Sequence, residues 1–227
     1  MAHTVPALLF DLDGTLVDSV YQHVAAWHDA LTSMSVPLSV WRIHRKVGMS
    51  GGLFVRGLMR ELGRDVEPST AVELRRRHAA AYAARFHEVV ALPGTRELLA
   101  TLTALGAPWA IATSGSRDVA DRTLALIDIP PHVPVVTRDE VEHAKPDPDL
   151  FLRAAERLGV RIADSIVVGD SVWDLLAARR AGALGIGLLS GGYGLDELQS
   201  AGAYRVYDDP AGLLAHLDEV GIRDPDL

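Results

Sequence analysis

The stretch PALLFDLDGTLVDS, Pro6 to Ser19, decides the fold and the chemistry that we expect. Ala7 to Phe10 is a short apolar run between a proline and an Asp-Gly breaker, so it predicts a buried strand. Asp11 and Asp13 follow at the carboxyl end of this strand. Side chains alternate along an extended chain, so the two carboxylates would point the same way, and like charges this close repel unless a cation or a shared proton offsets them.

Three interpretations of the acidic pair follow. The first is an ordinary surface turn at Asp13-Gly14. The second is a calcium-binding loop, which fails because Leu16 stands where its turn glycine belongs and Gln22 where its bidentate glutamate belongs. The third is a magnesium-dependent phosphoryl-transfer site, which requires further acids, a cation and a hydroxyl elsewhere in the chain.

The composition indicates a soluble globular protein. Of the 227 residues, 48% are hydrophobic and 23% charged, and the net charge of -8 gives no support for a nucleic-acid or acidic-membrane partner. Cysteine is absent, which excludes disulfides, thiolate metal sites and a cysteine nucleophile. The beginning MAHTVPALLF has no cationic start, and no stretch approaches the roughly 18 apolar residues of a membrane span. We expect a cytoplasmic protein, either a monomer or a homodimer.

A long helical insertion follows the first strand. Apolar residues recur at three- and four-residue steps after the first motif. Further helices are expected at Val40 to Val47, Leu53 to Leu62 and Thr70 to His87. No strand is expected between Thr15 and Leu92. We therefore divide the chain into a Rossmann-like catalytic core domain, residues 1–17 plus 90–227, and a helical cap domain, residues 18–89.

From Pro93 onward, strand and helix patterns alternate. Strands are expected at PWAIAT, VPVV, SIVVG, LGIGLL and YRVY, with helices between them. Gly106, Gly159 and Gly182 each follow a predicted helix, where a left-handed cap is favoured. The alternation predicts an α/β fold with a doubly wound, mainly parallel sheet. Ligands bind such sheets outside the carboxyl ends of the strands.

The residues after the predicted strands supply the parts that a phosphoryl-transfer site needs. They are Thr113, Ser114 and Gly115 after the second strand, Lys145 in HAKPDPD, and Asp170 and Asp174 in GDSVWD. Each signal alone is typical of a turn, a loop or a helix cap. Together they include the hydroxyl, the cation and the further acids at one edge of the sheet.

The segments DLDGT, TSGS, AKPDPD and GDSVWD resemble the four motifs of the haloacid dehalogenase superfamily. The helical insertion is similar to the small helical cap of the phosphoglycolate phosphatase and beta-phosphoglucomutase branch. The resemblance implies a magnesium-dependent phosphatase that hydrolyses a small phosphomonoester, such as phosphoglycolate, a sugar phosphate or a nucleotide, through an aspartyl-phosphate. The alternative is a phosphosugar mutase of the beta-phosphoglucomutase type, an isomerase.

The resemblance also implies roles for the acids. Asp11 would be the nucleophile, and Asp13 would be the general acid and then the general base. The ligands of Mg²⁺ would be the Asp11 carboxylate, the Asp13 backbone carbonyl and the Asp170 carboxylate, with Asp174 supporting them. Thr15 would either position Asp13 or cap a helix. An acid at position 13 argues against carbon–halogen hydrolysis, because dehalogenases of this family lack it.

Three further residues complete the implied site. Lys145 would balance the carboxylates and hold a phosphate oxygen. Ser114 and the Gly115 amide would bind the transferring group, with Thr113 in place of Ser114 if the strand register differs by one.

The cap residues leave hydrolase and mutase open. Gly51 falls where the mutase branch carries an arginine that grips a second phosphate, and this departure favours a phosphatase. His23 would contact the hinge or Asp13, or pack between helices. Arg45, Lys46 and Arg56 would bind an anionic leaving group or form a solvated face.

Overall fold

The computed structural model describes residues 5–61, 63 and 67–223. The chain divides into two compact units: the core unit, Met1–Asp18 with Ala91–Leu227, and the helical unit, Ser19–Val90. Residues 1–4 and 224–227, which we assign to the core, lie outside the described residues, as does Leu62, the expected end of one helix. The function of the helical unit as a cap stays a prediction.

The core unit is built on a six-stranded sheet in which β1 (Ala7–Phe10) is a central strand. The order is β5-β4-β1-β6-β7-β8, and every neighbouring pair is parallel. The other strands are β4 (Trp109–Ala112), β5 (Val135–Val136), β6 (Ser165–Gly169), β7 (Leu184–Leu188) and β8 (Ala203–Tyr207). In chain order the six strands lie 3-2-1-4-5-6, the Rossmann arrangement. This confirms the predicted doubly wound, parallel α/β fold.

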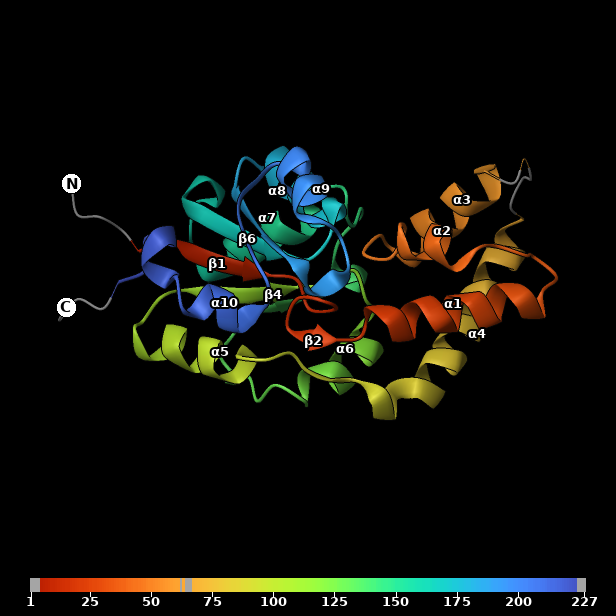
Figure 1. Ribbon diagram of the computed structural model, residues 1–227, viewed down its shortest axis with the longest axis horizontal. Helices are drawn as coiled ribbons and strands as arrows, with labels where there is room; N and C mark the ends of the chain where they lie inside the picture. The colour runs from red at the N-terminus through yellow and green to blue at the C-terminus, as the bar shows by residue number, and fades with distance from the viewer. Residues whose placement is uncertain (1–4, 62, 64–66, 224–227) are drawn as a thin grey trace. The chain divides into compact units, whose positions relative to one another are not determined.

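Helices cover both faces of this sheet (Figure 1). They are α5 (Thr95–Ala104), α6 (Arg117–Leu124), α7 (Asp149–Leu158), α8 (Val172–Ala181), α9 (Leu195–Ala201) and α10 (Pro210–Leu214). In Figure 1, α7 and α8 lie on one face and α5 and α10 on the other. All four residues of β1 are buried. Helices cover the strand on both faces, which is why its sequence is apolar throughout. Leu9, for example, packs in one cluster with Val167 of β6 and Phe151 of α7.

Short 3₁₀ turns and glycine caps connect these elements. The turns of the core unit are η2 (Arg138–Glu140), η3 (Ile162–Asp164), η4 (Leu189–Gly191) and η5 (Leu217–Val220). The predicted caps are confirmed: Gly106, Gly159 and Gly182 follow their helices with φ of 63°, 69° and 80°.

The helical unit consists of α1 (Val20–Ser33), α2 (Val40–His44), α3 (Gly51–Glu61), α4 (Pro68–Arg85) and the turn η1 (Phe86–Glu88). Helices α1 and α4 pack along each other (Figure 1). The core of the helical unit includes Trp27 of α1, Phe54 of α3 and Leu74 of α4. The helix expected over Val40 to Val47 is shorter, because the following residues form turns that lead to Gly48 with φ of 96°.

The expectation that no strand lies between Thr15 and Leu92 is wrong. Strand β2 (Val17–Asp18) and β3 (Val90–Ala91) form a separate two-stranded sheet. Beside it, the Leu92 amide donates to the Leu16 carbonyl at 3.0 Å. Two-residue strands show no hydrophobic period, and their partners are distant in sequence, so a local pattern does not reveal them.

Among the helices that the structure describes, none combines the length and the apolar character that crossing a membrane requires.

Candidate active site

The two strands at the centre of the sheet bring the first and last motifs together. Strands β1 and β6 are neighbours, with Phe10 paired to Val168, and the Asp11 amide donates to the Val168 carbonyl at 2.9 Å. Asp11 follows the last residue of β1, and Asp170 follows the last residue of β6. The chain winds outward in opposite directions from this pair of strands, so both acids lie at the topological switch point, where such folds bind ligands.

Three carboxylates gather at this point. Asp11, Asp170 and Asp174 each offer an oxygen atom within 4.8 Å of the others, and all three residues are buried. Lys145 has an exposed fraction of 0%; its Nζ contacts Asp11 Oδ1 and lies 2.7 Å from Asp174 Oδ1. The buried cluster therefore contains one ammonium group and three carboxyl groups. When all of them are ionised, the cluster carries a net negative charge.

This imbalance changes the proton affinities of the cluster. Burial raises the pKa of Asp11 to about 7; the charge of Lys145 opposes this rise, and that of Asp174 adds to it. Burial, followed by repulsion from Asp174 and Asp11, also raises the pKa of Asp170 well above its usual value. Burial alone would lower the pKa of Lys145, but Asp11 and Asp174 outweigh it and raise the pKa. A cation placed among these oxygens would relieve the repulsion.

Asp170 and Asp174 are held by further hydrogen bonds. The Thr15 hydroxyl donates to Asp170 Oδ1 at 2.9 Å, a partner that the sequence pattern did not indicate. Asp174 Oδ2 accepts from the Ser171 amide at 3.1 Å and from its hydroxyl at 2.5 Å, in a capping box at the start of α8. Both oxygens of Asp174 are thus engaged, Oδ1 by Lys145 and Oδ2 by Ser171.

The second motif forms a turn after β4. Thr113 is buried, and its hydroxyl accepts from the Gly115 amide at 3.0 Å. Ser114 and Gly115 are half-buried. The Thr113 hydroxyl therefore stabilises the turn itself, which favours Ser114 as the hydroxyl of the site.

Asp13 is half-buried and forms an isolated bridge with Val17. Its charge contributes to the raised pKa of Asp11, after the larger effects of burial, Lys145 and Asp174. The acidic pair of the first motif is therefore electrostatically linked.

One pair of residues at the same edge of the sheet was missed by the sequence analysis. Ser190 and Gly191 lie in η4, directly after β7. The Ser190 hydroxyl donates to the Gly14 carbonyl at 2.6 Å, and Gly191 lies against Asp170. In the sequence these two residues directly follow the predicted strand LGIGLL, and this position is the signal that indicates them.

The expected cap residues lie within the helical unit. His23 Nδ1 is 3.2 Å from His78 Nε2, and the His23 ring stacks on Tyr82 at 3.9 Å, which is the packing role. Lys46 forms an ion pair with Glu61 at 2.5 Å.

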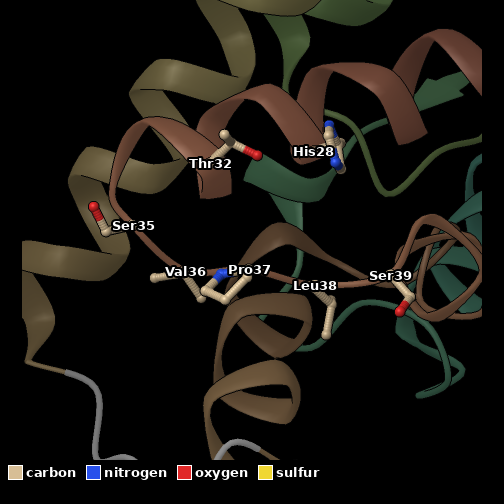
Figure 2. Close-up of a pocket in the computed structure, with 7 residues that line it drawn as sticks. All are labelled: His28, Thr32, Ser35, Val36, Pro37, Leu38 and Ser39. Carbon is tan, nitrogen blue, oxygen red and sulfur yellow. The ribbon is translucent and has the colours of Figure 1, made fainter.

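The surroundings of Gly51 and two hollows of the helical unit bear on the expected substrate contacts. A Cβ added at Gly51 would lie 3.4 Å from Arg75 Cδ, an ordinary van der Waals contact, so the stem of an arginine from α4 lies next to this position. A hollow of about 290 Å³ is lined by Trp41, Arg42, Arg45, Lys46 and Glu61. A larger one of about 600 Å³ is shown in Figure 2, between α1 and the loop after it, and contains none of the predicted site residues.

The residues of the core unit fit a hard divalent cation. The cluster offers only oxygen ligands, which Mg²⁺ prefers, and it carries more negative than positive charge. Glycine backbones press against two of the acids: a Cβ at Gly169 would lie 2.3 Å from Asp174 Cβ, and one at Gly191 would lie 1.8 Å from Asp170 Oδ2. Close packing of this kind fixes the carboxylates, as a metal site requires.

The chain matches the family model of the haloacid dehalogenase-like hydrolases over residues 5–182. It therefore belongs to this family, which confirms the expected resemblance and the hydrolase class. Hexitol phosphatase A of Escherichia coli is 35% identical over 77% of this chain and 78% of that protein. Phosphoglycolate phosphatase of Neisseria meningitidis is 32% identical over 82% of this chain and 81% of that protein. The crystal structure of a hydrolase from Pseudomonas syringae is 52% identical with a TM-score of 0.92, and the match covers 95% of this chain and 99% of that one. The relatives thus support the predicted phosphatase class.

Proposed function

We propose that the protein is a magnesium-dependent phosphatase that hydrolyses a small phosphomonoester through an aspartyl-phosphate. The observation that carries this proposal is the position of Asp11, which lies buried at the switch point beside Lys145 and Asp170. A carboxylate held there can attack a bound phosphoryl group.

In the first step, an Asp11 carboxylate oxygen attacks phosphorus, an Asp–O–P bond forms, and the bond from phosphorus to the ester oxygen breaks. Asp13 donates a proton to the departing alkoxide. In the second step, Asp13 takes a proton from water, which attacks the same phosphorus, so inorganic phosphate leaves and the Asp11 carboxylate is restored. General acid and base groups of this kind typically contribute about 10²–10⁴-fold in rate.

The remaining residues hold charge and orientation. Lys145, already in contact with Asp11, would bind one phosphoryl oxygen, and the Ser114 hydroxyl would donate to another. The Gly115 amide, which donates to the Thr113 hydroxyl, would exchange that bond for a phosphoryl oxygen. The Asp11 and Asp170 carboxylates and the Asp13 carbonyl would hold Mg²⁺, with Asp174 supporting them. When bound, Mg²⁺ supplies Lewis-acid polarisation of the phosphoryl oxygens and offsets the repulsion between an acidic site and a phosphate dianion.

The charge distribution favours a small phosphorylated metabolite as substrate. The helical unit, residues 19–90, contains ten Lys and Arg and six Asp and Glu, a net charge of +4, whereas the rest of the chain carries -12. An anionic substrate is repelled by the acidic core and attracted by the basic helical unit. A role of the helical unit as a cap that binds the leaving group agrees with this distribution.

One observation keeps the phosphosugar mutase as a second candidate. The absence of an arginine at position 51 favours a phosphatase, but the stem of Arg75 lies 3.4 Å from where a Cβ at Gly51 would be. An arginine of α4 is thus available next to the place where the mutase branch carries its own. A mutase would isomerise a sugar phosphate when primed with a bisphosphate, and would release little free phosphate.

The test is phosphate release from a panel of phosphomonoesters, with Mg²⁺ and with EDTA. We expect Mg²⁺-dependent release by the parent and a loss of at least about 10³-fold in Asp11→Asn. Asp18→Asn, which changes an exposed acid seven positions further along the chain, is the matched control and should retain activity. Full activity of Asp11→Asn, or equal rates in Mg²⁺ and EDTA, would overturn the proposal.

A further inference from the structure

The loop after β7 makes two contacts with the acidic site. A Cβ at Gly191 would lie 1.8 Å from Asp170 Oδ2 and 2.5 Å from Asp170 Cγ, distances at which no side chain fits unless Asp170 moves. Asp170 is a buried carboxylate with its other oxygen bonded to Thr15. Close approach of the Gly191 backbone to this carboxylate is therefore the reason for a glycine at this position.

The second contact reaches the first motif. The Ser190 hydroxyl donates to the Gly14 carbonyl at 2.6 Å, across 176 positions of sequence. Gly14 has φ of 84° and lies in the turn between Asp13 and Thr15. A hydrogen bond to its carbonyl restrains the orientation of this turn, which carries both the proposed general acid and the hydroxyl that binds Asp170.

These contacts form a closed ring. It runs from Ser190 to the turn at Gly14, through the Thr15 hydroxyl to Asp170, and from Asp170 back to Gly191, the neighbour of Ser190. Each member restricts the next, so Asp170 is held at one oxygen by a hydroxyl and at the other by a backbone surface. The ring joins the ends of β1, β6 and β7, three adjacent strands of the sheet.

We propose that Ser190 and Gly191 are positioning residues for the divalent-cation site: Gly191 fixes the Asp170 carboxylate, and Ser190 fixes the turn that carries Asp13. This inference rests on the proposed function, because it assigns the loop to the same metal-dependent site. Neither residue touches the reacting atoms. Partners that orient metal ligands from behind typically change metal affinity by about 10–100-fold when they are removed.

The test is calorimetric titration of Mg²⁺ into the full chain, which measures binding without reference to turnover. Gly191→Ala places a methyl group against Asp170 and should weaken Mg²⁺ binding by at least about 10-fold. Gly194→Ala is the matched control in the same loop, because its Cβ would meet only Glu197 Oε2 at 3.5 Å and its φ is -77°. We expect this control to bind Mg²⁺ as the parent does.

Ser190→Ala is the milder variant and keeps the proposal testable if Gly191→Ala does not fold. It should weaken Mg²⁺ binding by about 10-fold, and Ser190→Thr, which keeps the hydroxyl, should recover most of this loss. Excess Mg²⁺ should restore kcat in Ser190→Ala with KM for the ester unchanged, because the Asp13 carbonyl is a proposed ligand and bound Mg²⁺ would then hold the turn that Ser190 no longer restrains.

The outcomes separate the two proposals. Equal Mg²⁺ affinities of the parent, Ser190→Ala and Gly191→Ala would overturn the positioning role, while phosphate release by the parent would still support the phosphatase. A parent that binds no Mg²⁺ would overturn both.

Discussion

Replacing Lys145 by methionine tests whether one buried ammonium offsets the acidic cluster. Methionine keeps much of the side-chain volume but carries no charge, so Asp11 and Asp174 would lose the cation that they face. Removing one partner of a buried ion pair costs about 3–5 kcal/mol. A change of 1 kcal/mol shifts the Tm of a chain of this size by about 2–4 °C. We therefore expect metal-free Lys145→Met to melt about 6–20 °C below the parent.

The assay is thermal melting followed by circular dichroism in EDTA near neutral pH. Lys46→Met is the matched control, because the same substitution removes an ion pair whose acid, Glu61, has a side chain that is 44% exposed. Exposed pairs contribute about 0–1 kcal/mol, so this control should shift Tm by at most about 4 °C. If Lys145→Met lowers Tm by no more than Lys46→Met does, the claim that Lys145 offsets the charge of the buried acids is refuted.

The pH dependence of this Tm difference tests whether lost charge, rather than lost packing, destabilises Lys145→Met. Below the raised pKa of Asp11, about 7, a proton can replace the missing cation. The Tm difference between Lys145→Met and the parent should therefore narrow as the pH is lowered. A difference that stays constant would point to lost packing against Phe151, whose ring centre lies 5.2 Å from Lys145 Nζ, rather than to charge.

Three other predictions concern the same chain. Thr15→Val removes the donor to Asp170 Oδ1 and should lower the free energy of unfolding of the Mg²⁺-free protein by about 1–3 kcal/mol, measured by urea unfolding. Thr32→Val in the helical unit is the control. Equal losses of stability in the two variants would contradict a stabilising role of the Thr15 hydrogen bond. The pKa of Asp11 is raised from 3.8 to about 7 in the folded state. Between about pH 4 and about pH 7 the folded protein therefore keeps a proton on Asp11 that the unfolded chain has released. The free energy of unfolding of the metal-free protein should therefore fall as the pH rises from about 4 to about 7. The fall should be less steep in Asp11→Asn, and an unchanged slope would argue against this assignment. Arg75→Met should raise KM for esters with a second anionic group and leave KM for neutral leaving groups unchanged, as steady-state kinetics would show; an equal change for both would remove Arg75 from substrate recognition.

Much of the fold followed from local pattern. Alternating strand and helix periods predicted the doubly wound sheet, because burial on both faces requires apolar strands and each crossover helix needs an apolar stripe. The same pattern led to Asp11 and Asp170, since residues directly after parallel strands meet at one edge of a sheet, and to Lys145, in the loop that precedes the helix α7. The structure brings these three together at the switch point.

What the sequence by itself determined is therefore the type of sheet and the edge at which the charged residues collect. Only the tertiary structure decided how those residues are held: Thr15 bonds to Asp170 across 155 positions, and Ser190 bonds to Gly14 across 176. The strands β2 and β3 were hidden for the same reason. The hydrophobic period of a short segment indicates which of its residues are buried. A hydrogen bond between distant loops, or a glycine packed against a carboxylate, depends instead on distances that exist only once the strands have paired.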